Sequence, residues 1–150
     1  GHGMKNIRKI EGDDIETIAK MEAEIAKISF GDEAITDLET IGVRIKKAME
    51  KDKRGMLVLE IDGQIAAWLW MDKKENFLTK DIYVNFKSFY VVEQYRGEAL
   101  VSEFLQEGIK FAKEVGAKSI VGKVNVKNIA MRYLYKENGF EPTHMTMEKK

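Results

Sequence analysis

The sequence has no cysteine among its 150 residues and only two histidines, His2 and His144. The absence of cysteine excludes disulfides, thiolate metal ligands and a cysteine nucleophile. The two histidines are too few and too widely spaced to suggest a metal site. We therefore expect no bound metal, and the lack of cysteine fits a cytoplasmic location.

The chain also lacks an excess of charge of either sign, since 25 lysines and arginines balance 25 aspartates and glutamates. Binding to a phosphate backbone depends on a basic excess, so a nucleic-acid-binding role is disfavoured. No apolar run approaches the ~20 residues of a membrane-spanning helix, and the start of the chain is polar and charged, unlike a signal peptide. We expect the partners to be neither nucleic acids nor membranes.

The sequence does have enough apolar residues for one hydrophobic core. A length of 150 residues suits one domain, and the apolar content of 44% is that of ordinary globular proteins. Gly1, His2 and Gly3 precede Met4 and resemble the remnant of an expression tag. We therefore assign residues 4–150 to a single domain and residues 1–3 to the tag.

Hydrophobic periodicity predicts a strand and two helices in the first third of the chain. Lys5–Ile10 alternates polar and apolar residues, as a strand does. Asp13 and Asp14 offer an N-cap for one helix, and Thr36 with Glu39 forms a capping-box pattern for a second. Apolar residues at spacings of three and four give each helix one buried face: Ile15, Ile18, Met21, Ile25 and Ile28, then Leu38, Ile41, Ile45 and Ala48.

Three strands are predicted next. Met56–Ile61 and Gln64–Met71 flank Asp62-Gly63, a dipeptide typical of a tight hairpin. A charged loop, Lys73–Lys80, leads to Asp81–Gln94, which is long enough that we expect a bend or bulge within it. Alternation places five apolar side chains of this last strand on one face: Ile82, Val84, Phe86, Tyr90 and Val92.

Helices and strands alternate in the remaining chain. A helix over Gly97–Val115 is expected to end at Gly116, a typical C-cap residue. A strand, a short helix and two further extended segments follow: Ser119–Val124, Asn128–Glu137, Phe140–Glu141 and His144–Glu148. The strand, helix and strand between Tyr90 and Val124 predict a parallel pair joined by a right-handed crossover. The expected fold class is mixed α/β (α+β), with a mostly antiparallel sheet of about seven strands and helices on both faces.

One segment carries the strongest functional signal, VVEQYRGEALVSEFL at residues 91–105, which runs from a strand through a turn into a helix. Backbone N–H groups at a helix N-terminus face outward together with the positive end of the helix dipole, which makes an anion site. Gly97 lets a ligand approach the backbone closely, and Arg96 can add a charge-assisted contact. A pyrophosphate suits such a turn.

Two motifs of the chain are similar to those of the GNAT superfamily of N-acetyltransferases. The first is the acetyl-coenzyme A signature Gln/Arg-x-x-Gly-x-Gly/Ala, which falls on Gln94, Gly97 and Ala99. The second is NIAMRYLYKENGF, residues 128–140, which resembles the family's Asn-x-x-Ala…Leu-Tyr-x-x-x-Gly-Phe segment. The order and separation of the motifs and of the elements also match, so the resemblance covers Lys5–Glu148.

The resemblance implies that acetyl-coenzyme A is the cosubstrate and that no metal takes part. In this family the fourth and fifth strands splay apart, and the pantetheine arm pairs with the fourth strand as an added strand does. On this chain those strands are Asp81–Gln94 and Ser119–Val124. The pairing residues are Tyr90, Val91 and Val92, and one backbone N–H there polarises the thioester carbonyl. The implied cofactor-binding residues are Tyr90, Val91, Val92, Gln94, Tyr95, Arg96, Gly97, Glu98, Ala99, Leu100 and Asn128.

Tyr135 is the side chain that its motif position favours for catalysis, as the acid that protonates the departing thiolate. Glu93, at a strand end, is a candidate base for the attacking amine, with a solvated strand-end carboxylate as the simpler alternative. Tyr133 is expected to be a partly buried aromatic residue with no chemical role. Asn128 is first of all a helix N-cap, and a contact of its amide with the cofactor is an alternative.

The function that the resemblance implies is transfer of an acetyl group from acetyl-coenzyme A to a primary amine by direct attack. The alternative is a non-catalytic module that binds acyl-coenzyme A. Glu98 places a carboxylate beside the pyrophosphate turn, which favours that alternative. Val101 adds a branched side chain near the turn, which favours it too, unless that side chain faces the core. No specificity motif identifies the acceptor, and a homodimer is open by analogy only.

Overall fold

The structure is a computed structural model that describes residues 3–34 and 36–150. Its strands are β1 (Lys5–Lys9), β2 (Met56–Ile61), β3 (Gln64–Glu75), β4 (Ile82–Val91) and β5 (Ser119–Gly122). Its α-helices are α1 (Ile15–Phe30), α2 (Leu38–Lys51), α3 (Ala99–Glu114) and α4 (Ile129–Glu137). The chain order is the one expected from the sequence up to α4, and residues 1–2 of the expected tag lie outside the described residues.

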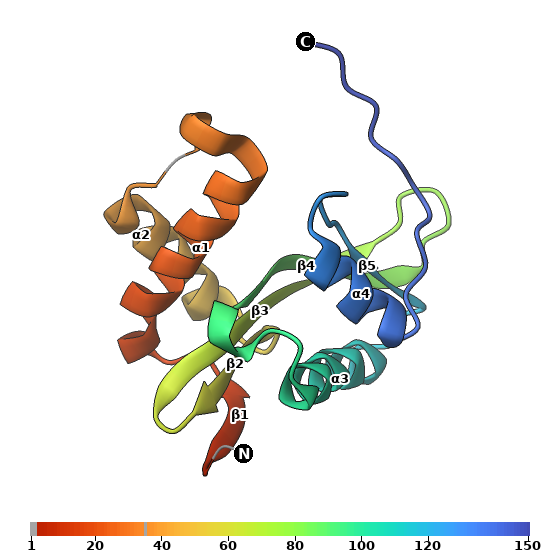
Figure 1. Ribbon diagram of the computed structural model, residues 1–150. Helices are drawn as coiled ribbons and strands as arrows, with labels where there is room; N and C mark the ends of the chain where they lie inside the picture. Colours follow the sequence, from red (N-terminus) through yellow and green to blue (C-terminus); the bar gives the residue numbers. More distant parts are fainter. Residues whose placement is uncertain (1–2, 35) are drawn as a thin grey trace.

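The strands form one mixed sheet in the order β1-β2-β3-β4-β5 (Figure 1). Neighbouring strands are antiparallel except β4 and β5, which run parallel and are joined by α3. The predicted parallel pair is therefore confirmed. The β2–β3 hairpin is confirmed as well, because Asp62 and Gly63 both adopt positive φ, at 50° and 80°, as a tight two-residue turn requires.

The sheet has five strands in the described residues, not the expected seven. The segments Phe140–Glu141 and His144–Glu148 form no strand, and most of residues 141–150 are exposed along a tail that leaves the body beside α4 (Figure 1). An alternating pattern alone does not make a strand, since a strand also needs a neighbour to accept its backbone hydrogen bonds. β5 is likewise shorter than expected and ends at Gly122.

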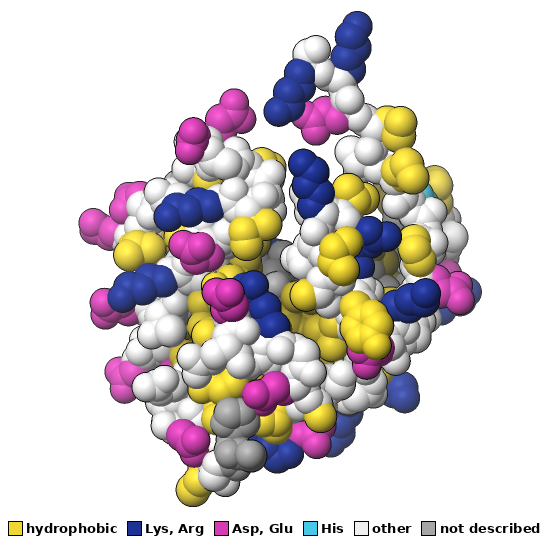
Figure 2. Space-filling view, viewed as in Figure 1, with side chains coloured by type: hydrophobic (Ala, Val, Ile, Leu, Met, Phe, Trp, Pro, Cys, Tyr) yellow, Lys and Arg dark blue, Asp and Glu magenta, His cyan; other side chains and the backbone are white. Residues whose placement is uncertain are grey.

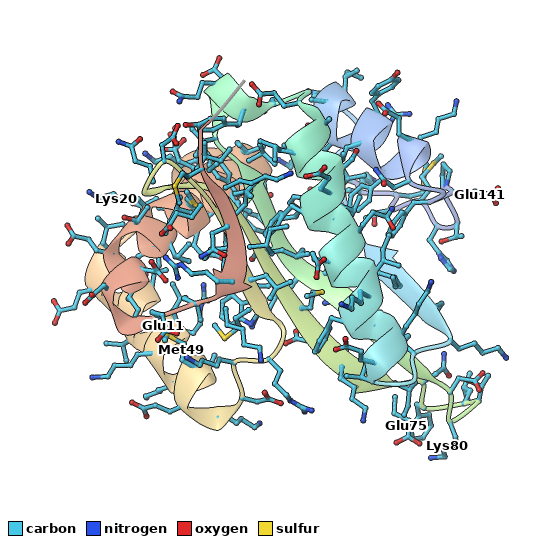
Figure 3. The ribbon with its side chains drawn as sticks, turned by 90° about the horizontal axis from the view of Figure 1, so that it is seen from below. Glu11, Lys20, Met49, Glu75, Lys80 and Glu141 are labelled. Atoms are coloured by element: carbon cyan, nitrogen blue, oxygen red, sulfur yellow. The ribbon has the colours of Figure 1, made fainter. Side chains whose placement is uncertain are left out.

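β3 is longer than expected because its charged end pairs with β4. The register Lys73 to Val84, Lys74 to Tyr83 and Glu75 to Ile82 extends the hairpin into the segment predicted as a loop. Figure 3 shows Glu75 and Lys80 close together at the tip of this hairpin. The charges of the segment are exposed there and do not oppose strand pairing.

A bulge divides β4. Phe86 pairs with Met71 and Ser88 pairs with Trp70, so Lys87 between them has no partner across the strand. The extra residue reverses the alternation, and Val84 and Phe86 pack on one face whereas Tyr90 packs on the other. The expected bulge is confirmed, but the expected single apolar face of this strand is wrong because of it.

Each face of the sheet carries its own hydrophobic core. One core joins α1 and α2 to Val58, Trp68 and Trp70. The other joins α3 and α4 to the alternate residues of the same strands, with Leu59 and Leu69 at its centre. Between the two helical layers the surface is hollowed over the sheet, and hydrophobic side chains lie at its floor (Figure 2). Seen from below in Figure 3, α3 runs along the sheet.

The helix ends differ in detail from the predicted caps. Asp37, not Thr36, caps α2, since its carboxylate accepts hydrogen bonds from Glu39 N at 3.2 Å and from the Thr40 hydroxyl at 2.6 Å. α3 ends before Gly116, which adopts φ +79° as predicted for a C-cap. The last apolar residue of the α1 stripe, Ile28, is exposed, because the helix has by then passed the edge of the sheet core.

Asp14 precedes α1 and anchors its start to the sheet. Arg8 of β1 donates two hydrogen bonds to its carboxylate, at 2.8 and 3.0 Å, and Glu11 N donates a third at 2.7 Å. Desolvation alone would raise the pKa of Asp14, but the hydrogen bonds from Arg8 and Glu11 and the charge of Arg8 outweigh it and lower the pKa.

Asp14→Asn is therefore expected to lower the free energy of unfolding at pH 7 by about 1.5–3 kcal/mol, the usual contribution of hydrogen bonds to a charged group. The loss should fade as the pH falls below about 3.9, because a carboxyl with a lowered pKa stabilises the fold only while it is ionised. Urea unfolding of the variant and the wild type between pH 7 and pH 2 measures this. An equal difference at every pH would contradict the assignment.

Candidate active site

β4 separates from β5 halfway along its length. The two strands pair from Tyr83 with Ser119 to Phe86 with Gly122, and no pair follows in the described residues, although β4 continues to Val91. The separation begins at the bulge at Lys87. Residues 87–91 therefore have an open edge on the side of β5, which an extended ligand can join by backbone hydrogen bonds.

Alternation of the backbone shows which residues face that edge. Val92 N donates to Ala66 O of β3 at 2.9 Å, so the backbone N–H and C=O groups of Val92 face β3. Those of Tyr90, two residues earlier, face β3 as well. Phe89 and Val91 then turn their N–H and C=O groups to the open edge. Of the three predicted pairing residues, Val91 is thus the one whose N–H faces the open edge, and Phe89 is a candidate that the sequence did not indicate.

Arg96 folds back onto this edge. Its Nε donates to Val91 O at 2.9 Å, and its guanidinium lies 5.7 Å from the centre of the Tyr90 ring. The side chain is exposed, and this hydrogen bond holds its guanidinium near the end of β4. A guanidinium held there can contact an anion at the following turn.

The turn between β4 and α3 is the segment in which an anion site is predicted. A 3-10 turn over Glu93–Tyr95 leads to Gly97 at φ +84°, and α3 begins at Ala99 with Glu98 as its N-cap residue. The N–H groups of Ala99 and Leu100 lie in the first turn of α3, where no helical carbonyl precedes them. Gly97 is exposed, and nothing lies within 4 Å of the position that a Cβ would take there.

The other side chains of the turn divide into exposed and buried groups. Glu93 and Gln94 are exposed, whereas Tyr95 is buried in the core beneath α3. Val101 is only 2% exposed and also packs into that core, so its branched side chain does not obstruct the turn. Among the residues predicted around the pyrophosphate, Tyr95 therefore has a structural side chain, and the obstruction expected from Val101 is absent.

Tyr135 lies where β4 and β5 separate. Its ring is buried and packs with Phe86, Phe89 and Phe140, at centroid distances of 6.4, 6.2 and 4.9 Å. The hydroxyl lies against Gly122, the last residue of β5, because a Cβ added at Gly122 would be 2.5 Å from it. Burial raises the pKa of this hydroxyl above its ordinary value, so it stays protonated at neutral pH.

Two other residues of the second motif have plainer roles. Asn128 is confirmed as the N-cap of α4, since its Oδ1 accepts a hydrogen bond from Met131 N at 3.1 Å. Tyr133, expected to be partly buried, is 65% exposed, because it lies on the side of α4 that faces away from the sheet. The structure thus brings Tyr135, and not Tyr133, to the open edge of β4.

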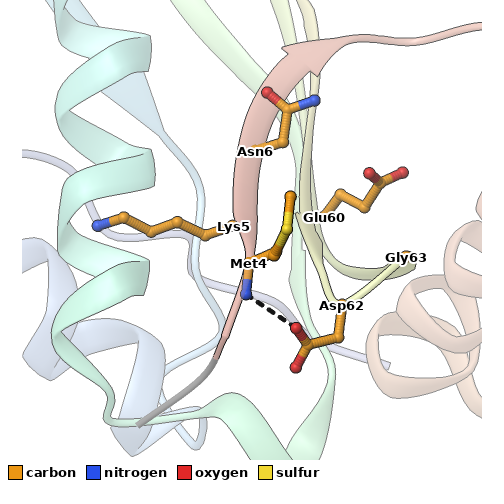
Figure 4. Close-up of a pocket in the computed structure, with 6 residues that line it drawn as sticks. All are labelled: Met4, Lys5, Asn6, Glu60, Asp62 and Gly63. Carbon is orange, nitrogen blue, oxygen red and sulfur yellow. Dashed lines mark hydrogen bonds between the residues drawn. The ribbon is translucent and has the colours of Figure 1, made fainter.

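A separate hollow of the described residues lies away from this opening. A shallow hollow of about 580 Å³ lies at the opposite edge of the sheet, between β1 and the β2–β3 turn, where Met4 N donates to Asp62 Oδ1 at 2.8 Å (Figure 4). Within residues 3–34 and 36–150, no three acidic or histidine side chains gather as a metal site requires. In the same residues, no helix is long and apolar enough to cross a membrane.

The chain is a mixed α/β protein in which a parallel strand pair opens before a helix N-terminus, an arrangement that suits an anionic ligand. Comparison with known proteins identifies the family. The sequence model of the acetyltransferase (GNAT) family matches residues 15–140. The chain therefore belongs to the GNAT acetyltransferase family.

Two curated relatives come from Bacillus subtilis. The uncharacterized N-acetyltransferase YdgE is 30% identical over 87 residues, which are 58% of this chain and 54% of that protein. The uncharacterized N-acetyltransferase YycN is 27% identical over 89 residues, 59% of this chain and 56% of that protein. The chain thus matches about half the length of each of these relatives.

Solved structures share the fold at low sequence identity. Glucosamine-6-phosphate N-acetyltransferase from Arabidopsis thaliana is 20% identical with a TM-score of 0.72, and each chain covers 99% of the other. The structure of AAC(6')-Iy in complex with a bisubstrate analogue, CoA-S-monomethyl-acetylneamine, is 11% identical with a TM-score of 0.73, over 99% of this chain and 98% of that one.

Proposed function

We propose that this protein transfers the acetyl group of acetyl-coenzyme A to a primary amine by direct attack of the amine on the thioester. The observation that carries the proposal is the opening between β4 and β5. The Tyr135 hydroxyl lies against Gly122 where the opening begins, the free edge of β4 follows, and the first turn of α3 comes after the end of β4. Membership of the acetyltransferase family supports the same reading.

The residues fit coenzyme A in two ways. The N–H groups of Phe89 and Val91 face the open edge, where they can pair with the amides of an extended pantetheine arm. The first turn of α3, with Gly97 before it and Arg96 nearby, suits a pyrophosphate. Acetyl-coenzyme A supplies an activated acyl group at the end of that arm.

The chain's own groups then have distinct tasks. A backbone N–H at the open edge can polarise the thioester carbonyl and hold the charge that develops on its oxygen. Tyr135 can donate a proton to the departing sulfur, since its hydroxyl is protonated and lies at the gap. Glu93 or water takes the proton from the amine, and Glu93 is exposed at the end of β4.

Two measurements test the proposal together. Calorimetry with coenzyme A measures binding, and release of free thiol from acetyl-coenzyme A with a panel of primary amines measures transfer. Binding with turnover on at least one amine is the expected result. Binding without turnover on any amine would favour a non-catalytic acyl-coenzyme A-binding module, and no binding at all would overturn both readings.

Gly97→Val is expected to weaken coenzyme A binding by about tenfold or more, or ~1.4 kcal/mol. Valine disfavours φ +84°, so the turn must change its path and its N–H groups lose their common direction. Gly116→Val is the matched control, because Gly116 also has positive φ and open space but follows the other end of α3. Equal affinity losses in the two variants would show that strain, not contact with the ligand, is the cause.

A further inference from the structure

Glu22 is a buried carboxylate that has no part in the proposed acetyl transfer. It lies in the middle of α1, on the side that packs against the sheet, and only 7% of it is exposed. Its Oε1 accepts a hydrogen bond from Trp68 Nε1 at 2.8 Å, and its Oε2 accepts one from Ser88 Oγ at 3.0 Å. Both donors are neutral, and no lysine, arginine or histidine of the described residues lies within 4 Å of it.

Asp14, the other buried carboxylate of the described residues, has a structural role. Asp14 receives two hydrogen bonds from Arg8 and a third from a backbone N–H, so its charge is balanced within the fold. A carboxylate taken out of water without a cation is costly, and neutral donors offset that cost only in part. Glu22 retains lone pairs on both oxygens for a further donor, and a cation is the donor that suits it best.

The position of Ser88 ties Glu22 to the candidate active site. Ser88 follows Lys87, the bulged residue, and is the second residue of β4 beyond Phe86, the last to pair with β5. Its side chain faces α1, on the opposite face of the sheet from Phe86, Phe89 and Tyr135. A group held by Glu22 and Ser88 therefore approaches the opening of the sheet from the α1 face, while Tyr135 stands on the α3–α4 face.

Two members of this cluster keep a small exposed surface. In Figure 2 the molecule is hollowed between the α1 side and the α4 side. Glu22 and Ser88 each keep 7% of their surface, whereas Trp68 beneath them keeps none. So limited an exposure suits a small cationic group at the end of a chain better than a bulky group.

We propose that Glu22, held by Trp68 and Ser88, binds the primary ammonium group of the acceptor on the α1 face of β4. The inference rests on the proposed function, because the bound ammonium group is the amine that later attacks the thioester. The inference also narrows the acceptor to a molecule with an unbranched, positively charged amino terminus or arm. At neutral pH such an amine is cationic, because its ordinary pKa is about 10.4. The site thus selects the acceptor by charge before the amine loses its proton.

The two tryptophans of the chain, Trp68 and Trp70, give a direct readout. The Trp68 indole N–H donates to Glu22, so its ¹H–¹⁵N resonance reports on that carboxylate, and Trp70→Phe assigns the two indole signals. The probe is ethylammonium chloride, titrated to about 100 mM against sodium chloride at equal ionic strength and against ethanol, a range that detects dissociation constants in the millimolar region. We expect a saturable shift of the Trp68 signal with ethylammonium and none with either control.

Glu22→Gln is the decisive variant, because glutamine keeps the shape and loses the charge. Its oxygen can still accept from Trp68, and its NH2 group can donate to the Ser88 hydroxyl oxygen. It should fold, retain coenzyme A affinity and lose the saturable shift. Glu24→Gln is the matched control on the same helix, since Glu24 is exposed and pairs with Lys27 at 3.6 Å, and it should keep the shift. A saturable shift that persists in Glu22→Gln, or its absence in the wild type, overturns the inference.

Steady-state kinetics provides a second test of the inference. With any amine that the wild type acetylates, Glu22→Gln should raise the KM for the amine at least about tenfold and leave the KM for acetyl-coenzyme A within about twofold. An unchanged amine KM also overturns the inference. Failure of the proposed function has a different signature, because coenzyme A then does not bind, or does not react, while the ammonium-dependent shift of Trp68 is still present.

Discussion

Tyr135→Phe is expected to lower kcat by about 10²- to 10⁴-fold, the usual contribution of a positioned proton donor. The hydroxyl is buried and lies against Gly122, at the point where β4 leaves β5. Burial raises its pKa, so its proton is present throughout the neutral range. Phenylalanine fills the same space among the surrounding aromatic rings and removes only the proton donor. Steady-state kinetics with any accepted amine measures the effect.

The affinity for acetyl-coenzyme A should change little in this variant. The proposed contacts of the cofactor come from the backbone of Phe89 and Val91 and from the first turn of α3, which the substitution does not touch. Tyr133→Phe is the control, because that residue lies on the same helix but is exposed, and it should leave kcat nearly unchanged. Full kcat in Tyr135→Phe would assign the proton transfer to water and leave Tyr135 a packing role.

Local sequence signals were sufficient for most of the fold because they depend on neighbouring residues. The turn at Asp62-Gly63, the helical stripes and the succession of β4, α3 and β5 are each encoded within a few residues. The charged end of β3 was assigned to a loop because its pairing depends on a partner strand, not on its own composition. The strand prediction for the C-terminal segments is wrong for the opposite reason. Their pattern suits a strand, but no neighbouring strand pairs with them in the described residues.

The sequence predicts the parts of the candidate site that local backbone structure defines. It does not predict the parts that form where two distant segments of the chain meet. The glycine at position 97 and the start of α3 follow from the motif. The bulge at Lys87 decides which residues face the open edge, and alternation counted from the sequence cannot locate it. The sequence gives one indication of Glu22, because an acidic residue stands four positions after Ile18 on an apolar helix face. Its partners Trp68 and Ser88 are 46 and 66 residues away, so the sequence does not identify them.

Gly122→Ala is expected to lower kcat by about 10²-fold, because a displacement of roughly 1 Å of a catalytic group has that effect. The Cβ of the new alanine would stand 2.5 Å from the Tyr135 hydroxyl and 2.8 Å from the ring carbon that bears it, so the ring tip must move. The move takes the hydroxyl away from the gap between β4 and β5. Gly12→Ala is the control, since an added methyl group meets nothing within 4 Å there.

A double-mutant cycle separates this positional effect from general overpacking, which itself costs about 1–3 kcal/mol of stability. If Gly122 acts by fixing the Tyr135 hydroxyl, then Gly122→Ala should change kcat little once Tyr135 is already phenylalanine, because the group that it displaces is gone. Circular dichroism and coenzyme A affinity should be close to those of the wild type in all variants. Independent, multiplicative losses of kcat would mean that Gly122 affects the reaction through the strand end itself, and that the position of the hydroxyl is not what the glycine protects.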